Sequence, residues 1–257
     1  SVTSNHYEWA AHNGNRAAAR FVFVMNYRTG LPDRLVDASM STSDNDVFHE
    51  IIRQTRPGTT WIFDRGYSRL ETIKEIINQR GHVITRWNAS YKWTLISRRK
   101  IRPDDTLQEG WEIICDEIGW VGALDNPGRA KYRRITCRHR ETGKLVIVLT
   151  DLRKHRAAKL VDMYVCRWPI EVTFRHVKSS LGTVHFPVRS QEGVHNWLIL
   201  IALSMIFIHL LANSVITGRL QPNQGLMAAH YPFKTYRRQV QTLLENEMFV
   251  TGVTSSR

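Results

Sequence analysis

The chain has 257 residues, and its 36 Lys and Arg against 23 Asp and Glu give a formal net charge of +13. This length is enough to bury a full core, as one domain or as one domain with an insertion. The charge favours an acidic partner, either nucleic acid or an anionic membrane surface. Three cysteines, far apart in the sequence, match neither a disulfide framework nor a zinc-binding spacing. We therefore expect a reducing, cytoplasmic environment.

The first part of the chain predicts strands followed by a helix. Residues 17–27 are apolar and rich in aromatic and β-branched side chains, which indicates a buried strand. Residues 33–40 are expected to pair back on it as a hairpin. Apolar residues recur at helical spacing over 47–52, after a run of cap-forming residues that begins at Ser43. A short strand at 59–63 follows.

That short strand runs directly into Asp64. A carboxylate after a buried strand lies where α/β sheets place their ligands. The alternative is a simple turn or helix-capping aspartate. Residues 68–80 then predict a helix that Gly81 caps, and 82–87 predict another strand. Strand, helix and strand in succession indicate an α/β layer.

Residues 88–152 lose helical periodicity and predict a mainly β, basic insertion. Strands are expected at 111–120, 131–140 and 144–151, the last one returning to the main sheet, and a helix at 153–163. Basic side chains interleaved with aromatic ones suit phosphate contact and base stacking, although a solvated sheet face is an equal alternative. The basic residues form two runs: Arg98, Arg99, Lys100 and Arg102, and then Arg133, Arg134, Arg138 and Arg140.

Residues 193–218 contain no Asp, Glu, Lys or Arg, and their centre is long enough to span a bilayer. A single-span membrane protein is therefore one alternative. A wholly buried helix of an α/β domain has the same character. Polar residues such as His195 and Asn213 interrupt the segment, and the rest of the chain contains no second candidate span. We expect a buried helix and no membrane partner.

The stretch from Tyr164 to Lys178 carries the most informative pattern. Tyr164, Arg167, Glu171 and Lys178 stand at offsets of 0, 3, 7 and 14, which on one helix fall within an arc of about 60°. Pro169 fits only the first turn of a helix, so Tyr164 and Arg167 can instead belong to a preceding helix. Asp64 and Glu171 together form a carboxylate pair that can bind Mg²⁺ or Mn²⁺ for in-line attack on phosphate.

This spacing resembles the tyrosine–arginine–glutamate–lysine signature of bacterial insertion-sequence DDE transposases, and Asp64-Arg-Gly-Tyr67 resembles their second-aspartate motif. The resemblance spans about residues 16–216. It implies an α/β, RNase H-like mixed sheet flanked by helices, with a β insertion between the second Asp and the Glu. It also implies two divalent ions held by Asp64 and Glu171, and cleavage of transposon ends followed by transfer into target DNA.

The same resemblance implies further roles. Tyr164, Arg167 and Lys178 are expected to contact double-stranded DNA near the scissile phosphate. Independently of the resemblance, their positive charge makes Arg65, Arg98, Arg99 and Lys100 candidates for binding DNA. Trp87 is a candidate for stacking a flipped base, and a homodimer on paired transposon ends is expected.

One feature of the family pattern is absent from the sequence. The family's first catalytic aspartate would fall just before Ser1, so either a fragment or an inactive DNA-binding remnant is an alternative to the enzyme. The expected parts are residues 1–87 and 153–218 for the catalytic domain, 88–152 for the insertion and 219–257 for a polar, basic tail.

Overall fold

The computed structural model describes residues 2–4, 12–13, 16–26, 31–38, 43–53, 55–107, 110–165, 167, 188 and 190–216. The chain divides into two compact units. The first comprises residues 1–43 and 168–250, and the second residues 44–167 with 251–257.

A small antiparallel sheet forms the described β structure of the first unit. Strand β3 (Arg16–Asn26) pairs with β1 (Val2–Ser4), β2 (His12–Asn13) and β4 (Leu31–Ala38). The predicted hairpin of two long strands is confirmed as β3 and β4, with a register irregularity between Val24 and Met25. Strand β1 was not predicted, because three residues are too short for a periodic pattern.

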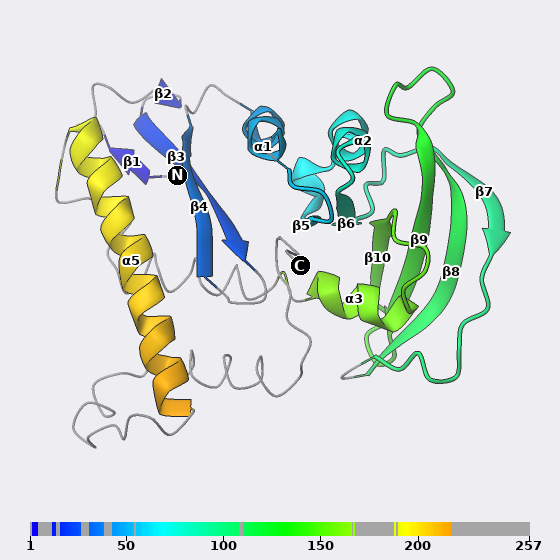
Figure 1. Ribbon diagram of the computed structural model, residues 1–257. Coiled ribbons are helices and arrows are strands. Elements are labelled where there is room, and N and C mark those ends of the chain that lie inside the picture. Colours follow the sequence, from blue (N-terminus) through cyan, green and yellow to red (C-terminus); the bar gives the residue numbers. More distant parts are fainter. Residues whose placement is uncertain are drawn as a thin grey trace. The chain divides into compact units, whose positions relative to one another are not determined.

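Helix α5 (Gln191–Ile216) also belongs to this unit and packs against β4 (Figure 1). Its described inward face includes Val194, Leu198 and Ile201, which are almost fully buried. The prediction of a helix in this charge-free segment is confirmed, but the expectation that the helix is buried all round is wrong, because Leu200, Leu203 and Phe207 are 54–63% exposed. None of the helices that the structure describes has the length and apolar character needed to cross a membrane.

A six-stranded mixed sheet is the frame of the second unit. Its strand order is β5 (Thr60–Phe63), β6 (His82–Arg86), β10 (Leu145–Thr150), β9 (Ala130–His139), β8 (Trp111–Val121) and β7 (Trp93–Arg98). Strands β5 and β6 are parallel and every other neighbouring pair is antiparallel. The two parallel strands therefore end at the same edge of the sheet, where Asp64 and Trp87 follow them.

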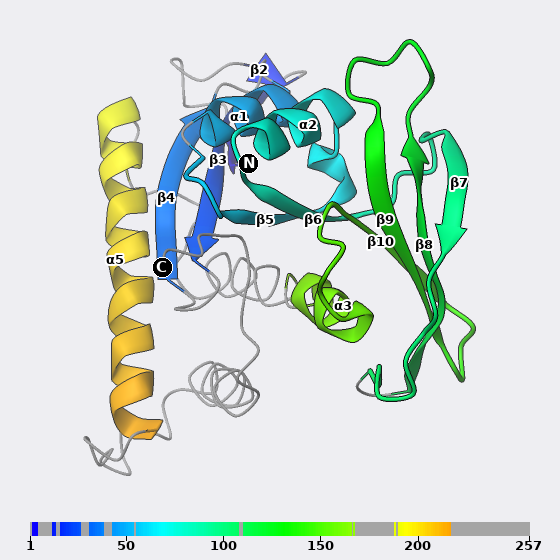
Figure 2. The same ribbon diagram turned by 45° about the vertical axis from the view of Figure 1, so that its right-hand side comes forward.

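Helices lie on both sides of this sheet, so the predicted α/β class with a helix-flanked mixed sheet is confirmed. Figures 1 and 2 show α1 (Asp44–Ile52) and α2 (Leu70–Asn78) on one side of β5 and β6, and α3 (Ala157–Val165) on the other. Phe48 of α1 makes ring contacts with Trp61, Phe63 and Tyr67. These aromatic contacts fix α1 beside the strand that leads to Asp64.

The end of α2 differs in detail from the prediction. The left-handed residue is Arg80, with a φ of 61°, and not Gly81. Backbone hydrogen bonds from Arg80 N to Ile77 O and from Gly81 N to Ile76 O close the helix. Gly81 is required for space, because an added Cβ would lie 2.8 Å from the Ile76 side chain.

The strands predicted as an insertion extend the sheet of β5 and β6. The predicted return of residues 144–151 to the main sheet is confirmed by the antiparallel pairing of β10 with β6. Strand β7 was not predicted. Most of its side chains are exposed, so it lacks the alternation of buried and exposed positions that marks a half-buried strand.

Six arginines of the two basic runs lie within ion-pair distance of an acid on the same sheet. Each of three acids, Glu112, Asp116 and Glu117, serves two of them. Arg133, Arg134 and Arg138 make the close pairs, at 2.6–2.7 Å, whereas Arg98, Arg99 and Arg140 lie at 3.4–3.5 Å. The second run therefore has a structural use in the sheet that its composition did not reveal.

Arg133 is the most deeply buried of these arginines, with 1% of its side chain exposed. Its Nε and Nη2 donate to the two carboxylate oxygens of Asp116 at 2.8 and 2.7 Å. Its Nη1 donates to the backbone carbonyl of His155 at 2.6 Å and lies 3.4 and 3.5 Å from those of Leu152 and Arg153. The helix predicted at 153–163 is confirmed as α3, but its predicted start is wrong, because this contact holds the backbone of residues 152–155 and α3 begins only at Ala157.

Replacing Arg133 with Met should lower the free energy of unfolding by about 3–5 kcal/mol, because the buried Asp116 carboxylate would lose its partner. Urea unfolding measures the change. Arg138→Met is the matched control: this exposed arginine pairs with Glu112 across the same two strands, and its loss should cost at most about 1 kcal/mol. An equal decrease in the free energy of unfolding in the two variants would contradict the claim that the buried Arg133 contributes more to stability than the exposed Arg138.

The contact between His82 and Asp151 makes stability depend on pH. His82 Nδ1 lies 2.7 Å from Asp151 Oδ2, and this hydrogen bond raises the pKa of His82 despite partial burial, which acts in the opposite direction. A raised pKa in the folded state stabilises the fold below the ordinary value of 6.5, and this contribution is lost as the pH rises through the folded-state pKa.

Between pH 6 and pH 8.5 the thermal midpoint of the wild type should therefore fall more than that of His82→Gln. Asp151→Asn should show the same flattened profile, since it removes the other partner. Parallel pH profiles for all three proteins would contradict the assignment.

Candidate active site

Asp64 stands at the end of β5 and begins the 3-10 helix η1 (Arg65–Tyr67). Its Oδ1 accepts a hydrogen bond from the backbone N–H of Arg65 at 2.8 Å, so the capping role left open by the sequence is confirmed. The side chain is partly exposed, and among the described residues no donor contacts Oδ2. The cap thus orients the carboxylate through Oδ1.

Tyr164 approaches this carboxylate from the face of the sheet that α3 covers, which is opposite the face covered by α1 and α2. It lies in the last turn of α3, its side chain is buried, and its hydroxyl lies 3.4 Å from Asp64 Oδ1, which is a long hydrogen bond. The structure therefore brings together two predicted site residues that are 100 positions apart.

The single helical arc drawn from Tyr164 to Lys178 is wrong at its start. Helix α3 ends at Val165, which confirms the alternative of a preceding helix for Tyr164, whereas Arg167 lies in a turn beyond the end of that helix. Pro169 cannot continue a helix interior, which is the physical reason for a break here. Glu171 and Lys178 lie outside the described residues, and so do the roles predicted for them.

Two cations accompany the phenol. The Arg167 guanidinium lies 5.8 Å from the centre of the Tyr164 ring. Burial and then the charge of Asp64 raise the pKa of Tyr164, while Arg167 and Arg86 act in the opposite direction. The phenol is therefore protonated at neutral pH and can donate to Asp64.

Arg86 was not singled out from the sequence as a site residue. It is the last residue of β6, one position beyond Thr85, which pairs with Phe63 of β5. The register thus sets Arg86 beside Asp64 at the edge where both strands end. The signal that could have found it is the same one that marked Asp64, a charged side chain at the end of a buried parallel strand.

The described residues contain no group of three or more His, Cys, Asp or Glu side chains placed to hold a metal ion. Asp64 alone offers a hard oxygen donor of the type that Mg²⁺ and Mn²⁺ prefer. Its uncapped oxygen fits a shared metal site, but a complete donor set would need carboxylates beyond the described residues.

The remaining predicted residues lie in different surroundings. Arg65 is exposed on η1. Arg98 is 75% exposed although it lies near Glu117, Arg99 lies near Asp116, and Lys100 is exposed. Trp87 meets Tyr91 and Trp93 edge to face, and the Arg134 guanidinium lies 5.2 Å from its ring centre. A base stacking on Trp87 would have to share the ring with these neighbours.

The fold and this site define an α/β domain with a carboxylate at the end of a central parallel strand, supported by a phenol and cations. The family model described as "Transposase DDE domain" matches residues 2–207, and the chain belongs to this family. The six-stranded mixed sheet with flanking helices agrees with the RNase H-like fold expected for such domains.

Curated relatives carry the same description. A protein of Sinorhizobium fredii named as a transposase, y4zB, is 25% identical over 186 residues, which is 72% of this chain and 49% of the relative. A probable transposase for insertion sequence element IS5377 of Geobacillus stearothermophilus is 23% identical over 77% of this chain and 50% of its own length. The transposase InsG for element IS4 of Escherichia coli is 25% identical over 76% and 45%. The chain spans about half the length of these relatives.

In the metal-dependent DNA cleavage that we propose for this domain, Tyr164→Phe should slow nicking by about 2- to 12-fold, the equivalent of one hydrogen bond, and leave DNA affinity unchanged. The nicking rate at saturating DNA measures the effect. The control is Tyr132→Phe, because the buried Tyr132 hydroxyl has no partner among the described residues. Equal rates in the wild type and Tyr164→Phe would contradict a role for the phenol at Asp64.

Proposed function

We propose that this chain supplies the catalytic domain of a bacterial DNA transposase, which cuts double-stranded DNA at transposon ends and joins those ends to target DNA. The observation that carries the proposal is the Asp64 carboxylate at the end of β5, contacted by the Tyr164 hydroxyl, in a chain of the transposase DDE family. Paired transposon ends imply a homodimer acting on DNA in the bacterial cytoplasm.

Asp64 and Glu171 are the proposed metal ligands. Two bound Mg²⁺ or Mn²⁺ ions would lower the pKa of the attacking hydroxyl and stabilise the leaving oxygen. Asp64 supports this role through its partly exposed side chain and its fixed cap. For Glu171 the support is its spacing from Tyr164 and Arg167 in the sequence.

The other residues of the site would hold the substrate. The Tyr164 hydroxyl orients the Asp64 carboxylate, and its burial keeps the proton on the phenol oxygen. Arg167, Arg86 and Lys178 carry positive charge that suits the phosphates on either side of the scissile bond. Arginine can bind a phosphate through two parallel N–H groups, which would fix the orientation of the DNA strand.

Asp64→Asn and Glu171→Gln should each reduce cleavage and strand transfer by roughly a thousandfold or more, because either change removes a charge from the metal site. The assay uses the complete gene product, a DNA duplex carrying the transposon end, and Mg²⁺. DNA binding measured in EDTA should persist in both variants.

Glu141→Gln is the control, since it removes an exposed acid from the loop between β9 and β10. Joining at the wild-type rate by Asp64→Asn or Glu171→Gln would overturn the ligand assignment. A wild-type protein that binds DNA but never cuts it would favour a DNA-binding remnant.

A further inference from the structure

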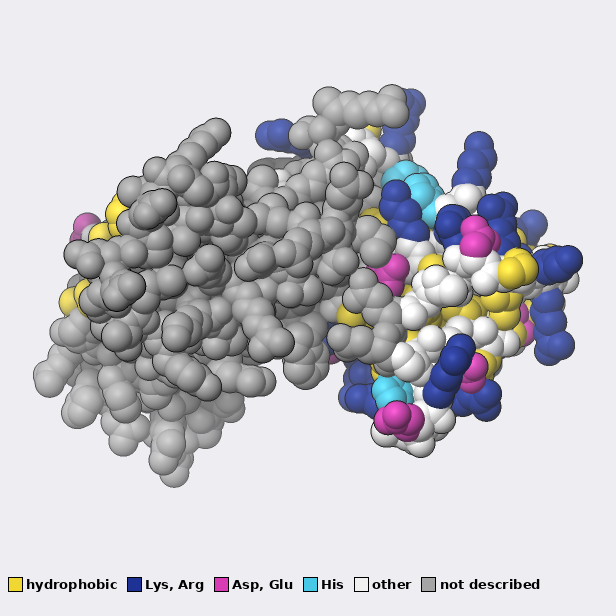
Figure 3. Space-filling view, turned by 90° about the horizontal axis from the view of Figure 1, so that it is seen from below, with side chains coloured by type: hydrophobic (Ala, Val, Ile, Leu, Met, Phe, Trp, Pro, Cys, Tyr) yellow, Lys and Arg dark blue, Asp and Glu magenta, His cyan; other side chains and the backbone are white. Residues whose placement is uncertain are grey.

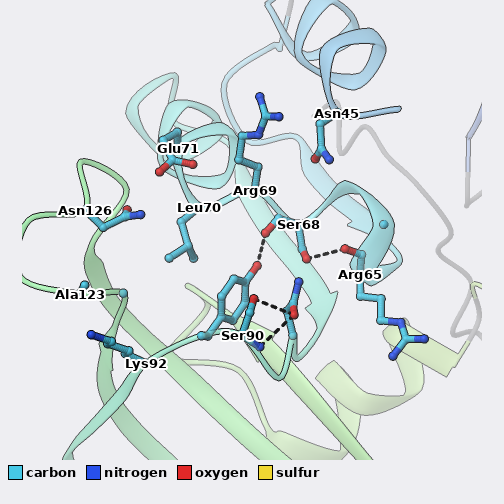
Figure 4. Close-up of a pocket in the computed structure, with 14 residues that line it drawn as sticks. Asn45, Arg65, Ser68, Arg69, Leu70, Glu71, Ser90, Lys92, Ala123 and Asn126 are labelled. Carbon is cyan, nitrogen blue, oxygen red and sulfur yellow. Dashed lines mark hydrogen bonds between the residues drawn. The ribbon is translucent and has the colours of Figure 1, made fainter. Parts of the chain in front are cut away.

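An open cavity of about 460 Å³ lies beside the candidate active site. Its lining comes from four places: the start of α1, η1 with the start of α2, the loop after β6, and the loop between β8 and β9. Figure 4 shows Leu70 in the middle, with Lys92 and Asn126 on one side and Asn45 and Arg65 on the other. The cavity therefore adjoins the carboxyl ends of the parallel strands β5 and β6, where α/β sheets bind their ligands.

The charge of the lining is predominantly positive. Arg65, Arg69 and Lys92 line the cavity, and Glu71 is the one acid among its lining residues. Arg65 is also the residue directly after Asp64, so the positive lining begins at the site of chemistry. Such a lining suits a ligand with several negative charges.

The cations that line the cavity differ from the arginines of the sheet in their ion pairing. Among the described residues, no Asp or Glu lies within ion-pair distance of Arg65 or Lys92. Arg69 lies 3.5 Å from Asp46, and both side chains are more than half exposed, so this pair contributes little. Arg133, Arg134 and Arg138, by contrast, are held in close pairs within the sheet. The cavity thus presents positive charge that the fold does not use.

Neutral polar groups complement the charge. Side-chain amides of Asn45, Asn88 and Asn126 face the cavity. Asn88 Oδ1 accepts from the Ser90 hydroxyl at 2.9 Å, and Asn126 Oδ1 accepts from Gly128 N at 2.7 Å. Because both oxygens are engaged as acceptors, these amides are oriented with their N–H₂ groups as the remaining donors. Donors and cations together favour phosphate oxygens.

The walls of the cavity are tied together. The Tyr91 hydroxyl donates to the carbonyl of Ser68, which joins the loop after β6 to η1. Gly128 approaches the start of α2 so closely that an added Cβ would lie 2.4 Å from the Leu70 carbonyl carbon. Lys74 Nζ also donates to the carbonyl of Pro127 at 2.6 Å. These contacts fix the loops of the lining relative to one another.

We propose that this cavity binds phosphodiester groups of the DNA strand that leads away from the Asp64 site. Arg69 and Lys92 would each contact one phosphate, and Asn88 and Asn126 would donate to the phosphate oxygens. The proposal rests on the proposed function for the identity of the ligand. It assigns backbone contact to a surface outside the Tyr164–Lys178 stretch and outside the two basic runs of the sheet.

The test is DNA binding by the complete gene product in EDTA. The probe is a fluorescein-labelled, mixed-sequence 30-base-pair duplex, followed by anisotropy at several NaCl concentrations. The double variant Arg69→Ala/Lys92→Ala should bind about tenfold more weakly, and the slope of log affinity against log salt should become shallower by about 2. Both side chains are exposed, so the variant should fold, which thermal unfolding verifies.

Arg53→Ala/Arg56→Ala is the matched control. It removes two exposed arginines from the end of α1 and the following turn, outside the lining of the cavity. Its salt slope should stay close to that of the wild type. Glu71→Gln supplies a test of opposite sign, because loss of the single lining acid should tighten binding by about threefold.

Equal slopes for Arg69→Ala/Lys92→Ala and the control pair would overturn the proposal, as would a Glu71→Gln variant that binds more weakly than the wild type. These outcomes are independent of the proposed function, because binding is measured without metal. The two proposals can fail separately. If the cavity variants change DNA binding as expected but Asp64→Asn cleaves DNA at the wild-type rate, the cavity proposal stands and the proposed catalytic role of Asp64 fails.

Discussion

The buried pair of Arg133 and Asp116 is the interaction on which much of the second unit depends. It joins neighbouring strands β8 and β9 and also holds the carbonyls of residues 152–155. Those carbonyls lie just before α3, so the guanidinium decides where that helix begins. Since α3 carries Tyr164 to Asp64, one buried ion pair connects the β-rich part of the sheet to the candidate active site.

The site itself follows from the parallel pairing of β5 and β6. Parallel strands end at one edge, and their register sets Asp64 and Arg86 side by side there. Helix α3 covers the face opposite α1 and α2, and its last turn adds Tyr164 from that side. Acid, phenol and cation thus come from three separate elements, which is typical of sites built on α/β sheets.

The basic residues of the second unit have two different roles: some form ion pairs within the sheet, and others line the cavity. Within the sheet, six arginines share three acids, and the closest pairs hold strands together. At the edge of the sheet, Arg65 and Lys92 stand beside a cavity where Glu71 is the one lining acid. On the face shown in Figure 3, Lys and Arg side chains project from the described surface and outnumber Asp and Glu. A net charge of +13 therefore reflects both structural pairs and positive charge left available to a ligand.

The sequence by itself determined the class of the fold and the position of Asp64, because strand and helix periodicity and the charged end of an apolar strand are local signals. It also singled out Tyr164 and Arg167 as candidate site residues through their spacing. Only the tertiary structure decided that Arg133 is buried, that α3 begins at Ala157, that Arg86 belongs to the site, and that Arg69 and Lys92 meet at one cavity. Those facts depend on strand register and on contacts between distant segments, and composition or spacing along the chain does not encode which charged side chain will find a partner.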